Sequence, residues 1–178
     1  MTSIPHSTDN ALVVESIAVN YGARPVVTDA SFTARAGTVT TIIGLNGSGK
    51  STLLRCVAAL SGPRHGTVSL ADLDVHRIPH KLLARKLAML PQTAVAPEGL
   101  TVADLVARGR QPHQRWYRQW SHDDEEIVLD SMRQLNVDQL GERPLDELSG
   151  GQRQRAWIAM CLAQQTPVIL LDEPTTHL

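Results

Sequence analysis

The residues Gly44-Leu45-Asn46-Gly47-Ser48-Gly49-Lys50-Ser51 satisfy the pattern G-x-x-x-x-G-K-[ST], and this stretch decides the fold. Its glycines allow successive backbone N–H groups to point inward at phosphate oxygens, and a following helix adds the positive end of its dipole. The Lys50 ammonium can then reach the β- and γ-phosphates, and the Ser51 hydroxyl can bind Mg²⁺. A chance glycine-rich turn is the alternative, but the strand predicted before the stretch and the helix predicted after it favour a phosphate-binding loop.

The segments around this loop predict a mixed α/β fold. Residues 38–43 are apolar enough for a strand buried on both faces, and residues 50–60 predict a helix that Ser61-Gly62-Pro63 ends. Residues 12–19 and 25–32 predict an antiparallel pair of strands joined by the turn Asn20-Tyr21-Gly22. Further strands are expected at residues 66–70, 87–90 and 168–171.

Helix signals follow one another from Pro91 onward and predict a helical insertion. Capping residues mark three helix starts: Thr101 with Asp104, Ser121 before the acidic turn of residues 123–126, and Ser149 with Gln152. The first of these helices covers residues 102–108 and is expected to stop at Gly109. The second carries an apolar stripe of Val128, Met132 and Leu135, and the third runs to about Gln164.

The predicted strand at residues 168–171 ends in two neighbouring acids, Asp172 and Glu173. One carboxylate at such a position can hold hydrated Mg²⁺, and the other can orient or deprotonate an attacking water. A solvated acidic turn before Pro174 is the alternative for this short string alone. The presence of a phosphate-binding loop in the same chain favours the catalytic interpretation.

The string Leu148-Ser149-Gly150-Gly151-Gln152 opens the third capped helix. Capping and anion binding use the same unsatisfied N–H donors, so the two interpretations are compatible. Placed between the phosphate loop and the acidic strand, this string resembles the signature of ATP-binding cassette (ABC) ATPases, and the resemblance covers residues 13–178. It implies an α/β fold of the P-loop NTPase class, an ABC-type nucleotide-binding domain with an antiparallel β subdomain and an α-helical insertion.

The resemblance also implies a domain division and a set of site residues. The nucleotide-binding core would occupy residues 1–91 and 165–178, with the helical subdomain at residues 92–164. Gln92 and Glu173 would be catalytic, Glu173 as the base, and Ser51, Gln92 and Asp172 would hold Mg²⁺. The residues expected to bind ATP are Tyr21 (stacked on adenine), Gly44, Asn46, Gly47, Ser48, Gly49, Lys50, Ser51, Thr52, Ser149, Gly150, Gly151 and Gln152.

Within the family, residues 106–113 and the segments at 163–166 and 174–178 resemble importers of iron-siderophore complexes, haem and cobalamin. The resemblance implies a head-to-tail homodimer in which Ser149, Gly150 and Gly151 contact the γ-phosphate held by a second subunit. It also implies transmembrane permease subunits, an extracytoplasmic binding protein as an indirect partner, and a cytoplasmic location on the inner face of the membrane. Two alternatives stay open: a non-catalytic ATP-binding fragment, and a soluble ABC protein that acts on ribosomes or nucleic acid.

Residues 108–120 interleave basic and aromatic side chains, namely Arg108, Arg110, Arg115, Trp116, Tyr117, Arg118 and Trp120. Alone, this pattern is compatible with a single-stranded nucleic-acid platform or with a half-buried helical surface. In the family this region docks on the permease, which favours a protein interface. The chain has 178 residues, 17 of them basic and 18 acidic, so its formal net charge of -1 supplies no general field for nucleic acid, and we expect none as a partner.

Two further expectations concern the chain as a whole. Cys56 and Cys161 match no metal or redox spacing and are predicted to be small buried hydrophobes of a reducing compartment, and no apolar run is long enough to cross a bilayer. The ABC family continues beyond the position of Leu178 with an aspartate loop and a strand that carries a switch histidine, so we expect a C-terminally truncated cassette. His177 matches a variable position of the family and not the switch histidine.

Overall fold

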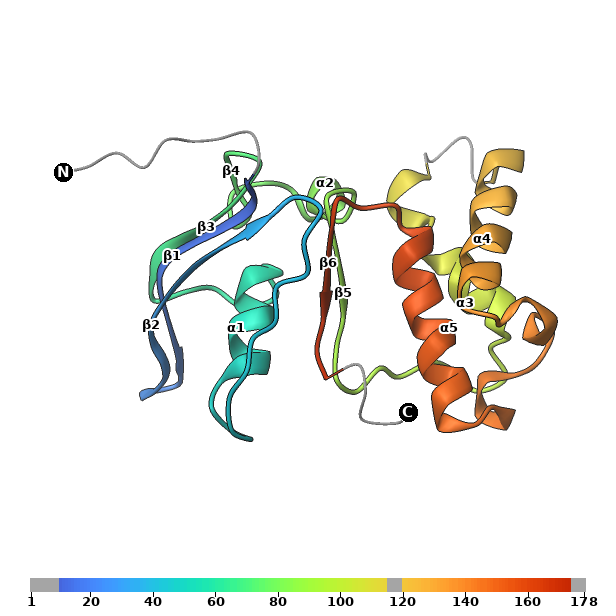
Figure 1. Cartoon of the computed structure of the whole chain (residues 1–178), viewed down its shortest axis with the longest axis horizontal. Helices are drawn as coiled ribbons and strands as arrows, with labels where there is room; N and C mark the ends of the chain where they lie inside the picture. Colours follow the sequence, from blue (N-terminus) through green and yellow to red (C-terminus); the bar gives the residue numbers. More distant parts are fainter. Residues whose placement is uncertain (1–9, 115–119, 174–178) are drawn as a thin grey trace. The chain divides into compact units, whose positions relative to one another are not determined.

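The computed structural model describes residues 10–114 and 120–173 of the chain. The chain divides into two compact units, Met1–Leu83 and Ala84–Leu178 (Figure 1). The segments around Pro174 and His177 lie outside the described residues. The division into residues 1–91, 92–164 and 165–178 stays a prediction.

The first unit is built on a four-stranded sheet of order β2-β1-β3-β4 (Figure 1). Strand β1 (Asn10–Tyr21) pairs antiparallel with β2 (Arg24–Arg35) and, on its other edge, with β3 (His65–Leu70), which pairs with β4 (Leu73–Asp74). The predicted antiparallel pair is therefore confirmed. The buried apolar residues of the sheet come mainly from β1 and β3, and include Leu12, Val14, Ile17, Val19, Val68 and Leu70.

Helix α1 (Lys50–Val57) contacts β1 and β2 and ends earlier than the predicted limit at residue 60. Its last turn is closed by the N–H of Leu60, which donates to the carbonyl of Arg55 at 2.9 Å, while Ala59 adopts a left-handed φ of 55°. This is the hydrogen-bond pattern that ends many helices, usually with glycine in the left-handed position. Alanine gives no such signal in a sequence, so the end was predicted too late. The short helix α2 (His80–Leu83) completes the unit.

The prediction of a strand at residues 38–43 is wrong, because the structure has no strand there. None of the described strands pairs with this segment, and two of its three apolar side chains are exposed: Val39 is 95% and Ile43 89% accessible, whereas Ile42 is half-buried. A strand exists only when its backbone N–H and C=O groups bond to a neighbour. The apolar composition of residues 38–43 predicts a buried strand only where neighbouring strands are present to pair with it.

The second unit combines a parallel strand pair with a group of helices (Figure 1). Strands β5 (Leu87–Leu90) and β6 (Val168–Leu171) are parallel, in register from Leu87 opposite Val168 to Leu90 opposite Leu171, as the sequence predicted for their positions. The helical elements, in chain order, are α3 (Val102–Arg108), η1 (Gln111–His113), α4 (His122–Gln134), η2 (Asp138–Leu140), η3 (Leu145–Glu147) and α5 (Gly150–Ala163). Their shared core comprises Val102, Leu105, Val106, Val128, Met132, Val137, Leu145, Leu148, Ala156, Ala159 and Ala163.

All three predicted helix caps are confirmed. The Thr101 hydroxyl accepts from the N–H of Asp104 at 3.1 Å, and α4 and α5 begin with complete reciprocal capping boxes, Ser121 with Asp124 and Ser149 with Gln152. The predicted stripe of α4 also faces the core, because Val128 and Met132 are buried and Leu135 packs against them. Short-range hydrogen bonds of this kind depend on residues only three positions apart, so sequence alone locates them.

Helix α3 ends at Arg108 with Gly109 as its C-cap, so the predicted stop is confirmed. The cap is not the left-handed turn that ends many helices, because Gly109 has a φ of -56° and a ψ of -25° and the backbone continues into η1. Glycine is needed here for space: a Cβ atom at this position would run into the carbonyl oxygen of Met160 and lie 3.1 Å from the Cβ of Ala163. The end of α3 thus approaches the backbone of α5 more closely than any side chain allows.

Both cysteines are buried free thiols, as predicted. Loss of hydration on burial raises the pKa of Cys161 to about 12 and also raises the pKa of Cys56. Such thiols stay protonated and unreactive at neutral pH. Their role is packing.

We predict that Gly109→Ala destabilises the second unit by about 1–3 kcal/mol, the usual cost of overpacking a core, because the new methyl group meets the backbone of α5. Urea denaturation followed by circular dichroism measures the free energy of unfolding. Gly62→Ala is the control, because Gly62 has nothing within 4 Å of a built Cβ. Equal stabilities of the two variants would contradict the close approach of α3 and α5.

Candidate functional site

The loop of residues 44–51 has the backbone geometry that a phosphate site needs. Gly47 and Gly49 adopt left-handed φ values of 77° and 93°, and the N–H of Ser48 donates to the carbonyl of Leu45 at 3.1 Å. The Lys50 ammonium folds back over the loop and donates to the carbonyls of Gly44 at 2.9 Å and Leu45 at 3.0 Å. The lysine charge is therefore held beside the loop backbone.

Gly49 also fixes the loop against β2. A Cβ atom there would lie 3.1 Å from the carbonyl oxygen of Val26, on top of an unfavourable φ, so glycine is required on two counts. The first intrahelical bond of α1 runs from the N–H of Leu53 to the carbonyl of Gly49. The amides of the preceding turn, which includes Thr52, are not used by the helix ladder and can face an anion.

Tyr21 ends β1 and is 76% exposed. Its ring is therefore not part of the hydrophobic core. An exposed aromatic ring beside the turn at Gly22 offers a flat face on which another ring can stack. Its contact with adenine stays a prediction.

The acidic strand end and Gln92 come together in the second unit. Because β5 and β6 are parallel and in register, the residues after Leu90 and Leu171 emerge at the same edge. The side-chain amide of Gln92 donates from Nε2 to Oε2 of Glu173 at 2.7 Å. Glu173 has a φ of 48°, a region uncommon for residues other than glycine and concentrated at functional sites.

Asp172 lies one residue earlier and is 2% exposed. Its N–H donates to the carbonyl of Leu90 at 3.0 Å, which extends the ladder between the two strands by one bond. The neighbouring acids thus occupy different surroundings, since Asp172 is buried and Glu173 is partly accessible. This matches the two different roles that the sequence predicts for them.

Ser149 and Gly150 are exposed at the start of α5. The N–H of Ser149 donates to Oε1 of Gln152 at 3.0 Å, and the N–H of Gln152 donates to the Ser149 hydroxyl at 3.3 Å. Arg153 anchors the turn through Nε, which donates to the carbonyl of Leu145 at 2.9 Å. The capping role is confirmed, and the binding of a phosphate by Ser149, Gly150 and Gly151 stays a prediction.

The basic and aromatic surface predicted at residues 108–120 needs one correction. Arg110 is only 6% exposed and forms an ion pair with Asp124, so it is a buried structural residue and not part of a surface. Arg108 and Trp120 are exposed, whereas Arg115, Trp116, Tyr117 and Arg118 lie outside the described residues. A half-buried helical surface was one of the alternatives for this segment, but nothing in the spacing of Arg110 indicates its ion pair with Asp124.

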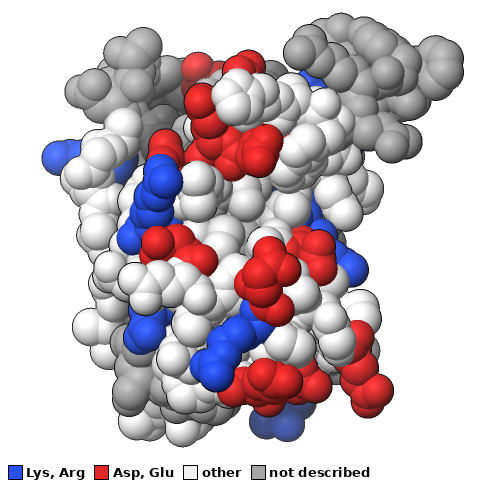
Figure 2. All heavy atoms as spheres, turned by 90° about the vertical axis from the view of Figure 1, so that its right-hand side faces the viewer, with Lys and Arg blue, Asp and Glu red and all other residues white. Residues whose placement is uncertain are grey.

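Charged groups are mixed on the face of the molecule in Figure 2, where acidic and basic side chains alternate among the described residues. No continuous basic area is visible on the described part of that face, which offers no extended surface for a nucleic-acid backbone. Of the helices in the described ranges, none combines the length and apolar character needed to cross a membrane.

A family model described as "ABC transporter" matches residues 27–176 of the chain. A probable siderophore transport system ATP-binding protein of Bacillus subtilis (strain 168), YusV, is 48% identical over 169 residues, which is 95% of this chain and 62% of the relative. The achromobactin transport ATP-binding protein CbrD of Dickeya dadantii (strain 3937) is 49% identical over 168 residues, 94% of this chain and 62% of the relative. The chain thus spans about 62% of the length of these curated relatives.

Solved structures show the same fold. A nucleotide-free ATP-binding cassette from an ABC transporter superposes with a TM-score of 0.81 at 26% identity, over 94% of this chain and 70% of that one. An ATP-binding cassette of an ABC transporter in its ADP conformation superposes with a TM-score of 0.82 at 25% identity, over 96% of this chain and 71% of that one.

Proposed function

Because this chain belongs to the ABC transporter family, we propose that it is the ATP-binding and hydrolysing subunit that energises an importer of iron-siderophore or related metal chelates. The observation that carries the proposal is the phosphate loop with Lys50 held over its carbonyls, immediately before the start of α1. The printed names of the relatives, which describe siderophore and achromobactin transport, support the class of cargo.

In this proposal the first unit binds the nucleotide. The amides of residues 44–50 and the Lys50 ammonium contact the phosphates, Thr52 adds a contact from the first turn of α1, and Tyr21 stacks on adenine. The binding residues of the loop, in chain order, are Gly44, Asn46, Gly47, Ser48, Gly49, Lys50 and Ser51.

Mg²⁺ would be held by Ser51, Asp172 and Gln92. The donor types suit this ion, because Mg²⁺ prefers oxygen ligands and the three side chains offer a hydroxyl, a buried carboxylate and an amide oxygen. When bound, the ion neutralises charge that develops on the β- and γ-phosphates.

Glu173 acts as the general base for the water that attacks the γ-phosphate. The proton of that water passes to a carboxylate oxygen of Glu173, while the Gln92 amide, 2.7 Å from Oε2, fixes the orientation of the carboxylate. A buried Asp172 and a partly accessible Glu173 allow the two acids to divide metal binding and proton transfer between them.

Ser149, Gly150, Gly151 and Gln152 would contact the γ-phosphate of ATP held by the loop of a second copy. The exposed helix start at Ser149 and Gly150 supports a head-to-tail homodimer, because the capping box uses only the N–H groups of Ser149 and Gln152 among the first amides of α5. The dimer would dock on transmembrane permease subunits from the cytoplasmic face of the membrane. An extracytoplasmic binding protein would select the metal chelate.

We expect Lys50→Ala to weaken ATP binding by about 10- to 100-fold, the loss of a charge-assisted hydrogen bond worth ~1.5–3 kcal/mol. Fluorescence titration with a labelled ATP analogue measures the dissociation constant. Lys81→Ala, on the exposed surface of α2 in the same unit, is the matched control and should keep the parental affinity. Tight binding by Lys50→Ala would remove the loop from the nucleotide site.

We expect Glu173→Gln to keep ATP binding and to slow hydrolysis by about 10²- to 10⁴-fold, the usual contribution of a positioned general base. Phosphate release gives the rate, and size-exclusion chromatography with ATP and Mg²⁺ should show an accumulated dimer. Glu147→Gln, an exposed acid of η3, is the control for the charge change. A Glu173→Gln protein that hydrolyses ATP at the parental rate would refute the role of Glu173 as base.

A further inference from the structure

The segment Gly109 to His113, quoted above only for its resemblance to metal-chelate importers, has a structural role in the second unit. It joins the end of α3 to η1 (Gln111–His113). Gly109 lets this segment lie directly against the last turn of α5, because a Cβ would collide with the carbonyl of Met160. The side chains that follow are therefore placed at the C-terminal end of α5.

Arg110 connects three parts of the chain from this position. Its Nε donates to Oδ1 of Asp124 in the first turn of α4 at 2.7 Å. Its Nη1 donates to the carbonyl of Ala163, the last residue of α5, at 2.9 Å, and to Oε1 of Gln165 at 3.2 Å. The Arg110 side chain is 7% exposed and the Asp124 side chain 14%, so these contacts are shielded from solvent.

The ion pair is fully charged at neutral pH. Burial by itself would raise the pKa of Asp124, but hydrogen bonds from Arg110 and Ser121 and the positive charge of Arg110 outweigh it, so that the pKa lies below its ordinary value. Ser121 is the cap of α4, so the same carboxylate joins the helix start to Arg110.

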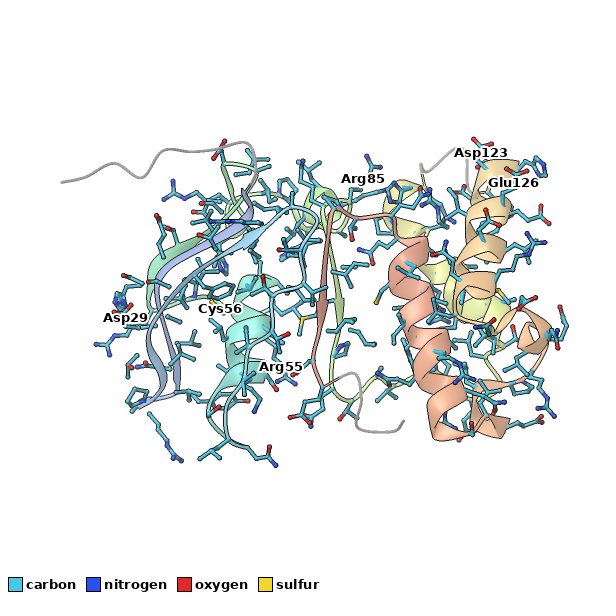
Figure 3. All side chains as sticks on the ribbon, viewed as in Figure 1. Asp29, Arg55, Cys56, Arg85, Asp123 and Glu126 are labelled. Atoms are coloured by element: carbon cyan, nitrogen blue, oxygen red, sulfur yellow. The ribbon has the colours of Figure 1, made fainter. Side chains whose placement is uncertain are left out.

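His113 and Gln164 extend the contacts to β5. Nε2 of His113 lies 2.8 Å from the carbonyl oxygen of Gln164, and Nε2 of Gln164 donates to the carbonyls of Ala84 at 2.6 Å and Leu87 at 3.2 Å. Arg85, labelled in Figure 3, donates from Nε to the carbonyl of Pro112 at 2.7 Å. The start of β5 is thereby tied to the same place as the end of α5.

Three elements of the proposed site meet at this point. Helix α5 starts at its cap Ser149, with the signature residues, and its last residue, Ala163, lies at the Arg110 contacts. Strands β5 and β6 begin near the same contacts and lead to Gln92 and to Glu173. Gln165, between α5 and β6, adopts a left-handed φ of 50°, and Arg110 holds its side chain. Energetic coupling between distant residues is carried by hydrogen-bond networks, packed side chains and rigid elements, and α5 also contacts β5, which pairs in register with β6.

We propose that Arg110, supported by His113, is a positioning residue that fixes the signature helix α5 relative to the strands carrying Gln92 and Glu173. This inference rests on the proposed ATPase function of the chain. Arg110 touches neither nucleotide nor reacting atoms, and it acts through Gln165 and the backbone of α5. A purely structural residue would affect stability alone, whereas a positioning residue also changes the rate of the chemical step.

The test compares Arg110→Met and Arg110→Lys with the control Arg133→Met in the full-length protein. Arg133 is an exposed residue of α4 paired only at the surface with Asp130. For Arg110→Met we expect ATP affinity within about twofold of the parent, because the phosphate loop lies in the other unit, and a kcat lowered about tenfold or more. Arg110→Lys should give an intermediate kcat, because an ammonium keeps the pair with Asp124 but lacks the fork that reaches two acceptors at once.

Gln165→Ala is the milder variant, and it decides the question if Arg110→Met does not fold. It removes one acceptor from an exposed residue and should lower kcat about threefold with an unchanged melting temperature. The inference is overturned if the Arg110 variants keep the parental kcat per folded molecule. If Arg110→Met does not fold, a parental kcat in Gln165→Ala overturns it instead. Either result leaves the ATPase proposal intact. A parent that neither binds nor hydrolyses ATP overturns both.

Discussion

The buried charge of Arg110 is the constraint on which the second unit depends. The side chain of Arg110 is 7% exposed, and its charge must be paired, because breaking a buried ion pair by removing one partner costs about 3–5 kcal/mol. Its partners are the first turn of α4, the last carbonyl of α5 and the residue that leads into β6. A shift of any one of these elements would leave the Arg110 cation or one of its acceptors without a hydrogen bond. The hydrogen bonds of Arg110 therefore restrict the relative positions of α4, the end of α5 and the start of β6.

Local rules predicted much of this fold. The caps at Thr101, Ser121 and Ser149 and the positions of the strands at residues 87–90 and 168–171 follow from residue types only a few positions apart. The parallel pairing of these two strands joins remote segments and was not predicted. The sequence-based predictions failed where the local structure depends on segments that are remote in sequence. Residues 38–43 have strand composition but no partner strand among those described, and Gly109 is a glycine because of Met160 on another helix.

The candidate site divides in the same way. The phosphate loop and its helix are contiguous, so the pattern of glycines and Lys50 predicted their geometry directly. Gln92 and Glu173 are 81 positions apart, and only the family resemblance placed them in one site. Nothing near Arg110 in sequence indicates that Asp124 and Ala163 fold back onto it, so its buried ion pair could not be predicted. Contacts between remote segments are the part that a single sequence does not contain.

The proposed role of Arg110 makes helix α5 and the strands β5 and β6 one mechanically connected piece. Hydrogen–deuterium exchange of the full-length protein, compared between the parent and Arg110→Met, tests this claim most directly. We expect faster amide exchange both in the first turn of α5, near Ser149, and at residues 168–173, with unchanged exchange in β1 of the first unit. Faster exchange limited to the immediate neighbours of residue 110 would contradict the claim.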